Sequence, residues 1–222
     1  MSGESLNAKY EALQAERARN MAPADLAANI RQREHLVANA DRGNFPKPGD
    51  VVPDFNVTEA DAGPLTSREL LARGPVVVLF FRFATCPACN IALPHYAQTL
   101  APELTARGAT LLALSPQIPE KLREIKTRHN LPFLVATDAD NTLARHFGLT
   151  FLPTPEARAN AEAKGNDLGA TIGTGSWELP MPAVIVIGQD RTVTFADVSP
   201  DWLKRTEAKE VLAALPEVTS AQ

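Results

Sequence analysis

The chain has 222 residues, enough for one large domain with an extension, and its hydrophobic (45%) and charged (22%) contents are those of an ordinary globular protein. The formal net charge of −4 argues against nucleic acid as a main partner, and no apolar run reaches the length of a membrane span. Residues 1–5 lack a basic region followed by an apolar one, so we expect no secretory signal. A cytoplasmic location, where thiols are kept reduced, is the default expectation.

Residues 1–47 are predicted to form a helical extension and linker, and residues 48–222 one domain. Leu6, Tyr10 and Leu13 repeat at helical spacing, and Pro23 suits the start of a second helix. Both helices are charged and only modestly apolar, which predicts that they lie on the surface. They either cover the core or act as a dimer arm, in which case the protein is a homodimer.

Strand and helix patterns alternate along the rest of the chain. The expected strands occupy residues 54–57, 75–81, 110–115, 133–137, 184–187 and 192–195, and the last two form a hairpin. The expected helices occupy residues 67–72, 87–108, 119–129, 141–147, 155–164 and 207–215. Residues 150–180 interrupt the alternation and are predicted to add a mobile loop at the rim of the active site. This order indicates an α/β fold with a central parallel or mixed sheet and helices on both faces.

Cys86 and Cys89 are the only cysteines, and they stand where the apolar run 75–81 has ended and a helical pattern begins. A helix N-terminus carries unpaired N–H groups and partial positive charge, which lower the pKa of a thiol placed there. Pro87 suits the first helical turn, which predicts Cys86 as an exposed nucleophile at the helix tip. Cys89 lies one turn further in, close enough to form a disulfide with Cys86 and resolve a mixed disulfide.

Two other interpretations of the cysteine pair compete with redox chemistry. A zinc site needs four ligands, and no second Cys or His pair stands at ligand spacing, so we expect no metal. Buried structural thiols are common, but a C-x-x-C between a strand and a helix favours redox chemistry. His95 lies about 13 Å from Cys86 along the helix axis, too far for a direct Cys–His pair.

Residues 86–94, Cys-Pro-Ala-Cys-Asn-Ile-Ala-Leu-Pro, resemble the active-site helix of the thioredoxin superfamily, including its proline at Pro94. Met181-Pro182 before an apolar strand resembles the cis-proline element that faces the disulfide in that superfamily. Residues 114–116 and 138–149 are similar to the peroxiredoxin branch, the alkyl hydroperoxide reductase/thiol-specific antioxidant group. The resemblance covers residues 48–216 and implies a thioredoxin-like fold with a C-x-x-C active site.

The chain departs from these families at several positions. Thioredoxins carry a buried Asp six residues before the first Cys, where this chain has Phe80. Peroxiredoxins place a Thr three residues before the reactive Cys and an Arg near the position of Pro182, whereas here Thr85 directly precedes Cys86. Arg82 lowers the pKa of the Cys86 thiol further if the two side chains meet, and is an ordinary surface residue if they do not.

The resemblance implies a thiol-dependent antioxidant oxidoreductase without a cofactor, in which Cys86 attacks and Cys89 resolves. The expected substrate-binding residues are Arg82, Thr85, Met181 and Pro182. The expected substrate is a hydroperoxide or a disulfide. Peroxide reduction is expected to be modest, because the groups that activate the peroxide are displaced. The expected reductant is a thioredoxin-like protein or a low-molecular-weight thiol. Two alternatives stay open: a protein disulfide reductase without significant peroxidase activity, and a non-enzymatic binding module switched by its dithiol.

Overall fold

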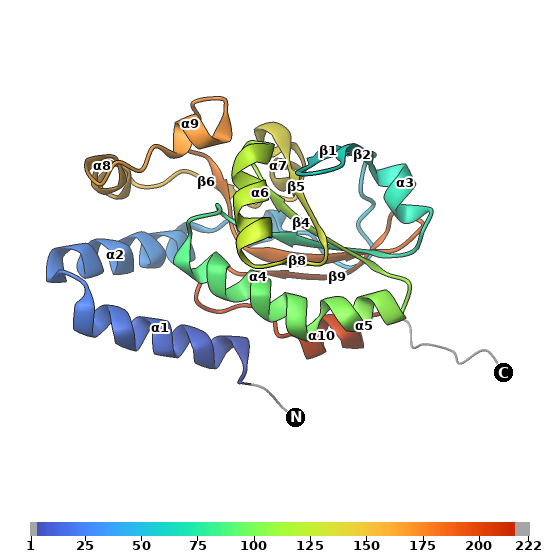
Figure 1. Cartoon of the computed structure of the whole chain (residues 1–222), viewed down its shortest axis with the longest axis horizontal. Helices are drawn as coiled ribbons and strands as arrows, with labels where there is room; N and C mark the ends of the chain where they lie inside the picture. Colours follow the sequence, from blue (N-terminus) through green and yellow to red (C-terminus); the bar gives the residue numbers. More distant parts are fainter. Residues whose placement is uncertain (1–3, 216–222) are drawn as a thin grey trace.

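The computed structural model describes residues 4–215; residues 1–3 of the predicted extension and residues 216–222 of the predicted domain lie outside the described part (Figure 1). Its strands are β1 (Asn56–Glu59), β2 (Gly63–Thr66), β3 (Val76–Phe80), β4 (Thr110–Ser115), β5 (Leu134–Thr137), β6 (Thr150–Phe151), β7 (Leu179–Pro180), β8 (Ala183–Ile187) and β9 (Val193–Val198). Its α-helices are α1 (Leu6–Asn20), α2 (Pro23–Asn39), α3 (Ser67–Leu71), α4 (Pro87–Thr99), α5 (Ala101–Ala106), α6 (Pro119–Arg128), α7 (Thr142–His146), α8 (Pro155–Ala163), α9 (Leu168–Ile172) and α10 (Ala208–Ala213). Short 3-10 turns, η1 (Arg42–Asn44) and η2 (Ala139–Asn141), complete the order.

Within residues 4–215, seven strands form one mixed sheet in the order β2-β1-β5-β4-β3-β8-β9. The central strands β3, β4 and β5 are parallel, whereas β8 pairs antiparallel with β3 and β1 with β5. Side chains alternate between the two faces of a strand, so each strand contributes to two cores. Val77 and Leu79 face a core shared with α1, α4, α6 and α10, and Phe80 faces a second core shared with α3 and α7. The expected α/β sheet with helices on both faces is confirmed.

Three segments differ from the sequence expectation. The helix predicted over residues 87–108 is broken into α4 and α5 at Leu100, because Pro102 has no N–H for a continuing helix and its ring clashes with the preceding turn. The strand β2 was not anticipated and pairs with β1. The region 150–180 holds α9 and a β6–β7 ladder in addition to α8, and buried Trp177 and Leu179 lie in a small core of their own.

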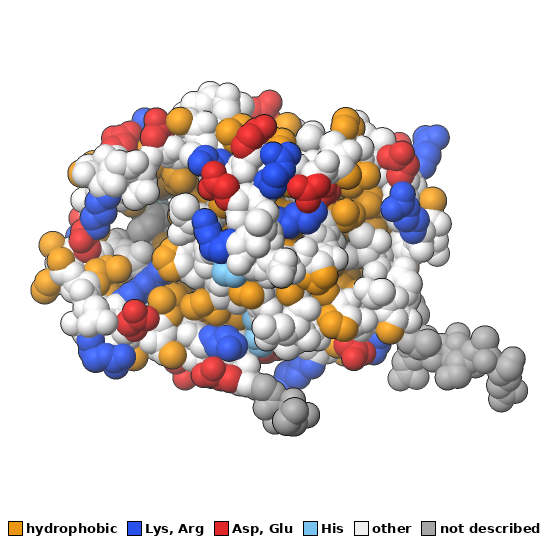
Figure 2. All heavy atoms as spheres, viewed as in Figure 1, with side chains coloured by type: hydrophobic (Ala, Val, Ile, Leu, Met, Phe, Trp, Pro, Cys, Tyr) orange, Lys and Arg blue, Asp and Glu red, His pale blue; other side chains and the backbone are white. Residues whose placement is uncertain are grey.

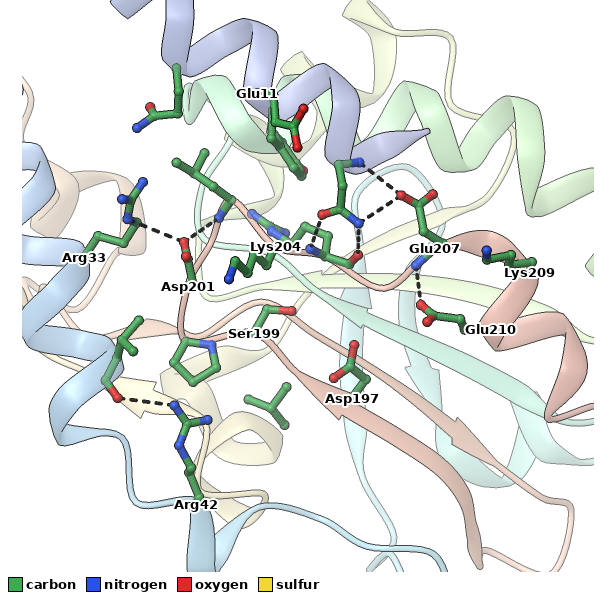
Figure 3. Close-up of a pocket in the computed structure, with 18 residues that line it drawn as sticks. Glu11, Arg33, Arg42, Asp197, Ser199, Asp201, Lys204, Glu207, Lys209 and Glu210 are labelled. Carbon is green, nitrogen blue, oxygen red and sulfur yellow. Dashed lines mark hydrogen bonds and ion pairs between the residues drawn. The ribbon is translucent and has the colours of Figure 1, made fainter. Parts of the chain in front are cut away.

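The extension packs on the core of the same chain. Leu6 and Tyr10 of α1 are at most 1% exposed and belong to the core around α4. The backbone N–H groups of Leu6 and Asn7 donate to the carboxylate of Glu207 at 3.2 and 3.0 Å, and Figure 3 shows this carboxylate facing the start of α1. A carboxylate there also interacts favourably with the helix dipole. The structure thus supports the interpretation that the N-terminal extension covers the core. Its role as a dimer arm stays a prediction.

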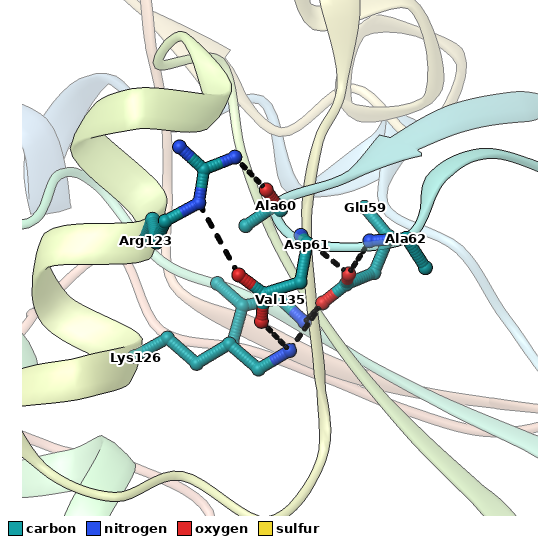
Figure 4. Close-up of polar contacts among 7 residues, drawn as sticks. All are labelled: Glu59, Ala60, Asp61, Ala62, Arg123, Lys126 and Val135. Carbon is teal, nitrogen blue, oxygen red and sulfur yellow. Dashed lines mark hydrogen bonds and ion pairs between the residues drawn. The ribbon is translucent and has the colours of Figure 1, made fainter.

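An ion-pair cluster around the buried Glu59 connects α6 to β1 and the turn that follows it (Figure 4). Glu59 is 2% exposed and its carboxylate contacts Lys126 Nζ at 2.6 Å, while the same nitrogen reaches Asp61 at 2.7 Å. The backbone N–H groups of Asp61 and Ala62 also donate to Glu59, both at 2.7 Å. Burial alone would raise the pKa of Glu59, but these hydrogen bonds lower it below its usual value.

Candidate active site

The cysteine pair lies where β3 leads into α4, as predicted. Cys86 is the N-cap of α4 with extended backbone angles, and its Sγ accepts the N–H of Cys89 at 3.4 Å. Pro87 occupies the first helical turn, where no N–H donor is needed. Both cysteines are free thiols.

The predicted exposure of Cys86 is wrong, because both cysteines are 0% exposed. Segments from both ends of the chain lie over the α4 face: Tyr10 of α1 and Trp202, which precedes α10, are in the same core as the two thiols. Tyr10 Oη donates to the carbonyl oxygen of Ala88, between the cysteines, at 3.1 Å. A reagent must therefore pass other side chains to reach Cys86 Sγ.

Arg82 faces the thiol. Its Nη2 donates to Cys86 Sγ at 3.0 Å, and its guanidinium lies 4.3 Å from the ring centre of Trp202. Ser115 Oγ at the end of β4 donates to the carbonyl oxygen of Arg82 at 3.1 Å, which fixes the backbone that carries it. Of the two interpretations of Arg82, the geometry supports the cation beside the thiol.

A second arginine, which sequence reasoning missed, comes from the far end of the chain. Arg205 is 6% exposed, its Nε donates to the carbonyl oxygen of Trp202 at 2.8 Å, and its guanidinium lies 5.8 Å from the ring centre of Tyr10. Its charge acts on both cysteines. No spacing pattern links Arg205 to Cys86, so only the closure of the fold brings them together.

The two thiols are electrostatically unequal. Burial alone would raise the pKa of Cys86, but a hydrogen bond from the Cys89 thiol, the charges of Arg82 and Arg205 and the Cys89 N–H lower it well below its usual value. Burial and the neighbouring Cys86 thiolate raise the pKa of Cys89 well above its usual value. The arrangement favours the thiolate form of Cys86 and the protonated form of Cys89.

Polar side chains fix the loop that presents the thiolate. The N–H of Ala84 donates to Gln117 Oε1 at 2.6 Å. Asn90 Nδ2 donates to the carbonyl oxygens of Ala84 and Cys86 at 2.8 and 2.9 Å. His129 Nε2 lies 2.7 Å from Asn90 Oδ1 and orients that amide. Such locked surroundings keep a nucleophile in one geometry.

The expected cis bond at Met181-Pro182 is wrong: the peptide is trans. The chain runs extended from β7 into β8, and neighbouring strands hold it, since the N–H of Met181 donates to Leu149 O and the N–H of Ser199 to Pro182 O, both at 2.7 Å. Met181 is 2% exposed, so its N–H is not free for a docked substrate. A role of Met181 and Pro182 in substrate docking stays a prediction.

The remaining expected residues lie in different surroundings. Thr85 is exposed beside Cys86. Phe80 points to the second core, edge-on to Phe147, and so faces away from the thiols. His95 is buried against Tyr96, where burial lowers the pKa of its imidazole. In residues 4–215 no cluster of His, Cys, Asp and Glu side chains could hold a metal ion, and no helix is both long and apolar enough to cross a membrane.

Comparison with known proteins agrees with this architecture. Residues 48–196 match the model of the AhpC/TSA family. The thiol peroxidase of Mycobacterium tuberculosis is 27% identical over 175 residues, 78% of this chain and 90% of that protein. Peroxiredoxin Bcp of Escherichia coli is 26% identical over 103 residues, 46% of this chain and 65% of that protein.

Two solved structures share the fold. Peroxidoxin BcpB of Mycobacterium tuberculosis superposes with a TM-score of 0.60 at 24% identity, over 77% of this chain and 96% of that one. Prx3 of Vibrio vulnificus gives a TM-score of 0.59 at 20% identity, again over 77% and 96% of the two chains. From the family match and the fold, the chain belongs to the AhpC/TSA family of the thioredoxin superfamily and is a peroxiredoxin-family, thiol-dependent peroxidase.

Proposed function

We propose that Cys86 reduces a hydroperoxide and that Cys89 resolves the product as an intramolecular disulfide. The Cys86 thiolate attacks one peroxide oxygen, the S–O bond forms as the O–O bond breaks, and the leaving oxygen takes a proton and departs as an alcohol or water. The Cys89 sulfur then attacks the resulting sulfenic acid, the S–S bond forms and water leaves. Two thiols of an external reductant return the disulfide to the dithiol by exchange.

The observation that carries this proposal is the contact of Arg82 Nη2 with Cys86 Sγ at 3.0 Å. Peroxide reduction develops charge on the leaving oxygen, and a preorganised donor next to the attacking sulfur stabilises that charge in the transition state. The resemblance implies an arginine near the position that Pro182 occupies here, and Arg82, in the loop after β3, takes over its role in this proposal. Arg205 adds positive charge from the opposite end of the chain.

The burial of Cys86 favours a small substrate. A protein disulfide must bring an extended segment to the attacking sulfur, whereas Cys86 is 0% exposed and the N–H of Met181 is already paired. Hydroperoxides are small enough to enter through side-chain motion. For the same reason a low-molecular-weight thiol is the simpler reductant, and a thioredoxin-like protein would need α1 or the Cys86–Cys89 turn to open first. We place this cycle in the cytoplasm, where such reductants keep thiols reduced.

The test is peroxide consumption measured beside reduction of a protein disulfide, for the wild type, Cys86→Ser and Cys89→Ser. We expect the wild type to consume peroxide with turnover, and Cys86→Ser to be inactive. Cys89→Ser should react once and accumulate a sulfenic acid or, with added thiol, a mixed disulfide, both detectable by mass spectrometry. Equal trapping in the two variants, or disulfide reduction without peroxide consumption, would contradict the assignment.

A further inference from the structure

Two arginines beside the cysteine pair are held in place by uncharged groups. The guanidinium of Arg82 lies 4.3 Å from the ring centre of Trp202, and Arg205 Nε donates to the carbonyl oxygen of Trp202 at 2.8 Å. The guanidinium of Arg205 also lies 5.8 Å from the ring centre of Tyr10, whose hydroxyl donates to the carbonyl oxygen of Ala88. Aromatic rings and carbonyl groups attract cations but do not neutralise them. Both side chains therefore bring a full positive charge to the cysteine pair.

No carboxylate balances these two charges. In residues 4–215, neither Arg82 nor Arg205 forms an ion pair with an acidic side chain. Arg82 Nη2 donates to Cys86 Sγ at 3.0 Å, and the charge of Arg205 acts on the same sulfur. A buried charge is costly unless an opposite charge compensates it. Among the described side chains, the Cys86 thiolate is thus the anion that the two guanidinium groups share.

Formation of the disulfide removes this anion. In the proposed cycle, Cys86 Sγ becomes a neutral sulfur bonded to Cys89, so it no longer balances the charge of Arg82. The contacts of Arg82 and Arg205 with Trp202 do not depend on the charge of the sulfur, so they hold both cations in place after oxidation. Arg82 Nε and Arg205 Nη2 have no hydrogen-bond acceptor even in the reduced protein. The oxidised site therefore has an excess of positive charge and of N–H donors.

A polar groove of about 820 Å³ connects Arg205 with the surface. It lies between α1, α2 and residues 197–210, and Tyr10 and Arg205 are among the residues that line it (Figure 3). Charged side chains of both signs line this groove, and Arg33 and Asp201 pair with each other at 3.6 Å. Figure 2 shows both signs of charge interspersed over the face that carries α4 and α6, without a large patch of one sign. An anion is therefore attracted by the cations inside and not by the outer surface.

The surroundings suit a small anion with a single charge. Oxidation of Cys86 removes one negative charge, and one negative charge restores the previous balance. The aromatic rings of Tyr10 and Trp202 replace water around part of the site, and loss of water costs a multiply charged anion more than a singly charged one. Hydrogen bonds from a guanidinium to an anion are among the strong ones in proteins.

We propose that the oxidised protein binds one small monovalent anion, such as chloride, beside Arg82 and Arg205, where it replaces the negative charge of the Cys86 thiolate. This inference rests on the disulfide step of the proposed function and adds a ligand that is neither substrate nor reductant. Because the anion binds the disulfide form in preference to the dithiol form, its concentration shifts the equilibrium between the two.

The equilibrium is measured against dithiothreitol, a neutral thiol that does not compete for an anion site. The two cysteines lose two electrons to oxidised dithiothreitol, which takes the Cys89 proton and one proton from solvent. The fraction of disulfide is read by alkylation and mass spectrometry, while chloride replaces the bulky anion gluconate at constant ionic strength and neutral pH. The equilibrium constant for disulfide formation should rise at least about threefold between about 5 and about 200 mM chloride. Its limit, once the site is filled, is tenfold per tenfold chloride, or about 30 mV.

Arginine variants assign the effect to the site. Arg205→Gln should abolish the chloride dependence, and Arg205→Lys, which keeps the charge, should retain it. Arg107→Gln is the matched control, because Arg107 Nη1 also donates to a backbone carbonyl, that of Leu212 at 3.0 Å, and it should respond to chloride as the wild type does. Arg82→Gln replaces Arg205→Gln if circular dichroism shows that the latter is misfolded.

A second measurement detects binding without a redox partner. Chloride should raise the Tm of the disulfide form more than that of the dithiol form at constant ionic strength. Equal shifts in the two forms, no response of the equilibrium to chloride, or the same response in Arg205→Gln and the wild type overturns the inference, and the peroxidase proposal then stands. If Cys86 and Cys89 form no disulfide at all, the resolving step of the proposed function fails, and the anion site fails with it.

Discussion

Replacing Arg82 by Gln should raise the pKa of Cys86 and slow peroxide reduction. The guanidinium lies 3.0 Å from the sulfur, where two unit charges attract by about 5 kcal/mol at an effective dielectric constant of about 20. Part of that attraction offsets desolvation, and hydrogen bonds to charged groups contribute about 1.5–3 kcal/mol net. At 1.36 kcal/mol per pKa unit, we expect the pKa of Cys86 to rise by about 1–2 units.

The assay is the rate of alkylation against pH in a Cys89→Ser background, which leaves Cys86 as the single thiol. Peroxide reduction should fall by about 100-fold in Arg82→Gln, the usual loss for one transition-state donor. Disulfide exchange should fall less, because it depends mainly on the thiolate fraction. Arg73→Gln, at an exposed arginine after α3, is the matched control and should change neither rate.

Two results would refute this reasoning. An unchanged pKa in Arg82→Gln would mean that Arg205 and the helix terminus alone stabilise the thiolate. Equal losses of peroxide and disulfide reduction would mean that Arg82 acts only through the thiolate and not on the leaving oxygen. Arg82→Lys separates charge from geometry: it should retain most of the pKa shift but less of the peroxidase rate, since an ammonium lacks the planar pair of donors.

Two further perturbations test the cover over the thiols and the ion-pair cluster. Tyr10→Phe should lower the free energy of unfolding by about 1 kcal/mol and speed the alkylation of Cys86. The control Tyr96→Phe loses a comparable buried hydrogen bond and should lower the free energy of unfolding equally, without changing the alkylation rate. Equal alkylation rates in the two variants would contradict a covering role for Tyr10. Glu59→Gln should cost about 2–4 kcal/mol at neutral pH in denaturant unfolding, against less than about 0.5 kcal/mol for the exposed Glu124→Gln. Folding lowers the pKa of Glu59, so its stabilisation is present above the unfolded-state pKa of about 4.3 and is lost as pH falls towards the folded-state pKa. The difference in unfolding free energy between wild type and Glu59→Gln should therefore shrink below about pH 4.5. A difference that persists at lower pH would contradict the ion pair.

The burial of Cys86 also bears on catalysis. In the proposed cycle, Cys86 is 0% exposed and reacts only after a path opens past Arg82 or α1 moves. The hydrogen bond from Tyr10 to Ala88 joins α1 to the turn that must rearrange when Cys86 and Cys89 form a disulfide. We therefore expect disulfide formation in the proposed cycle to be accompanied by a movement of α1.

Local patterns in the sequence determined the elements and the position of the cysteine pair between a strand and a helix. The apolar run before Cys86, Pro87 in the first turn and the helical spacing after Cys89 depend only on neighbours along the chain, and they predicted the strand, the helix and a thiol at its N-cap. The alternation of strands and helices was likewise enough to predict a mixed sheet with two helical layers.

Tertiary structure alone decided what surrounds the thiols. Tyr10 and Arg205 are separated from the cysteines by many tens of residues, and no period or spacing encodes their convergence on Cys86. The peptide bond at Pro182 is trans, and two hydrogen bonds hold the segment: Met181 N–H donates to Leu149 O, and Ser199 N–H donates to Pro182 O, which a motif does not show. Cys86 is buried because distant segments pack together, and packing is a property of the closed fold rather than of any stretch of sequence.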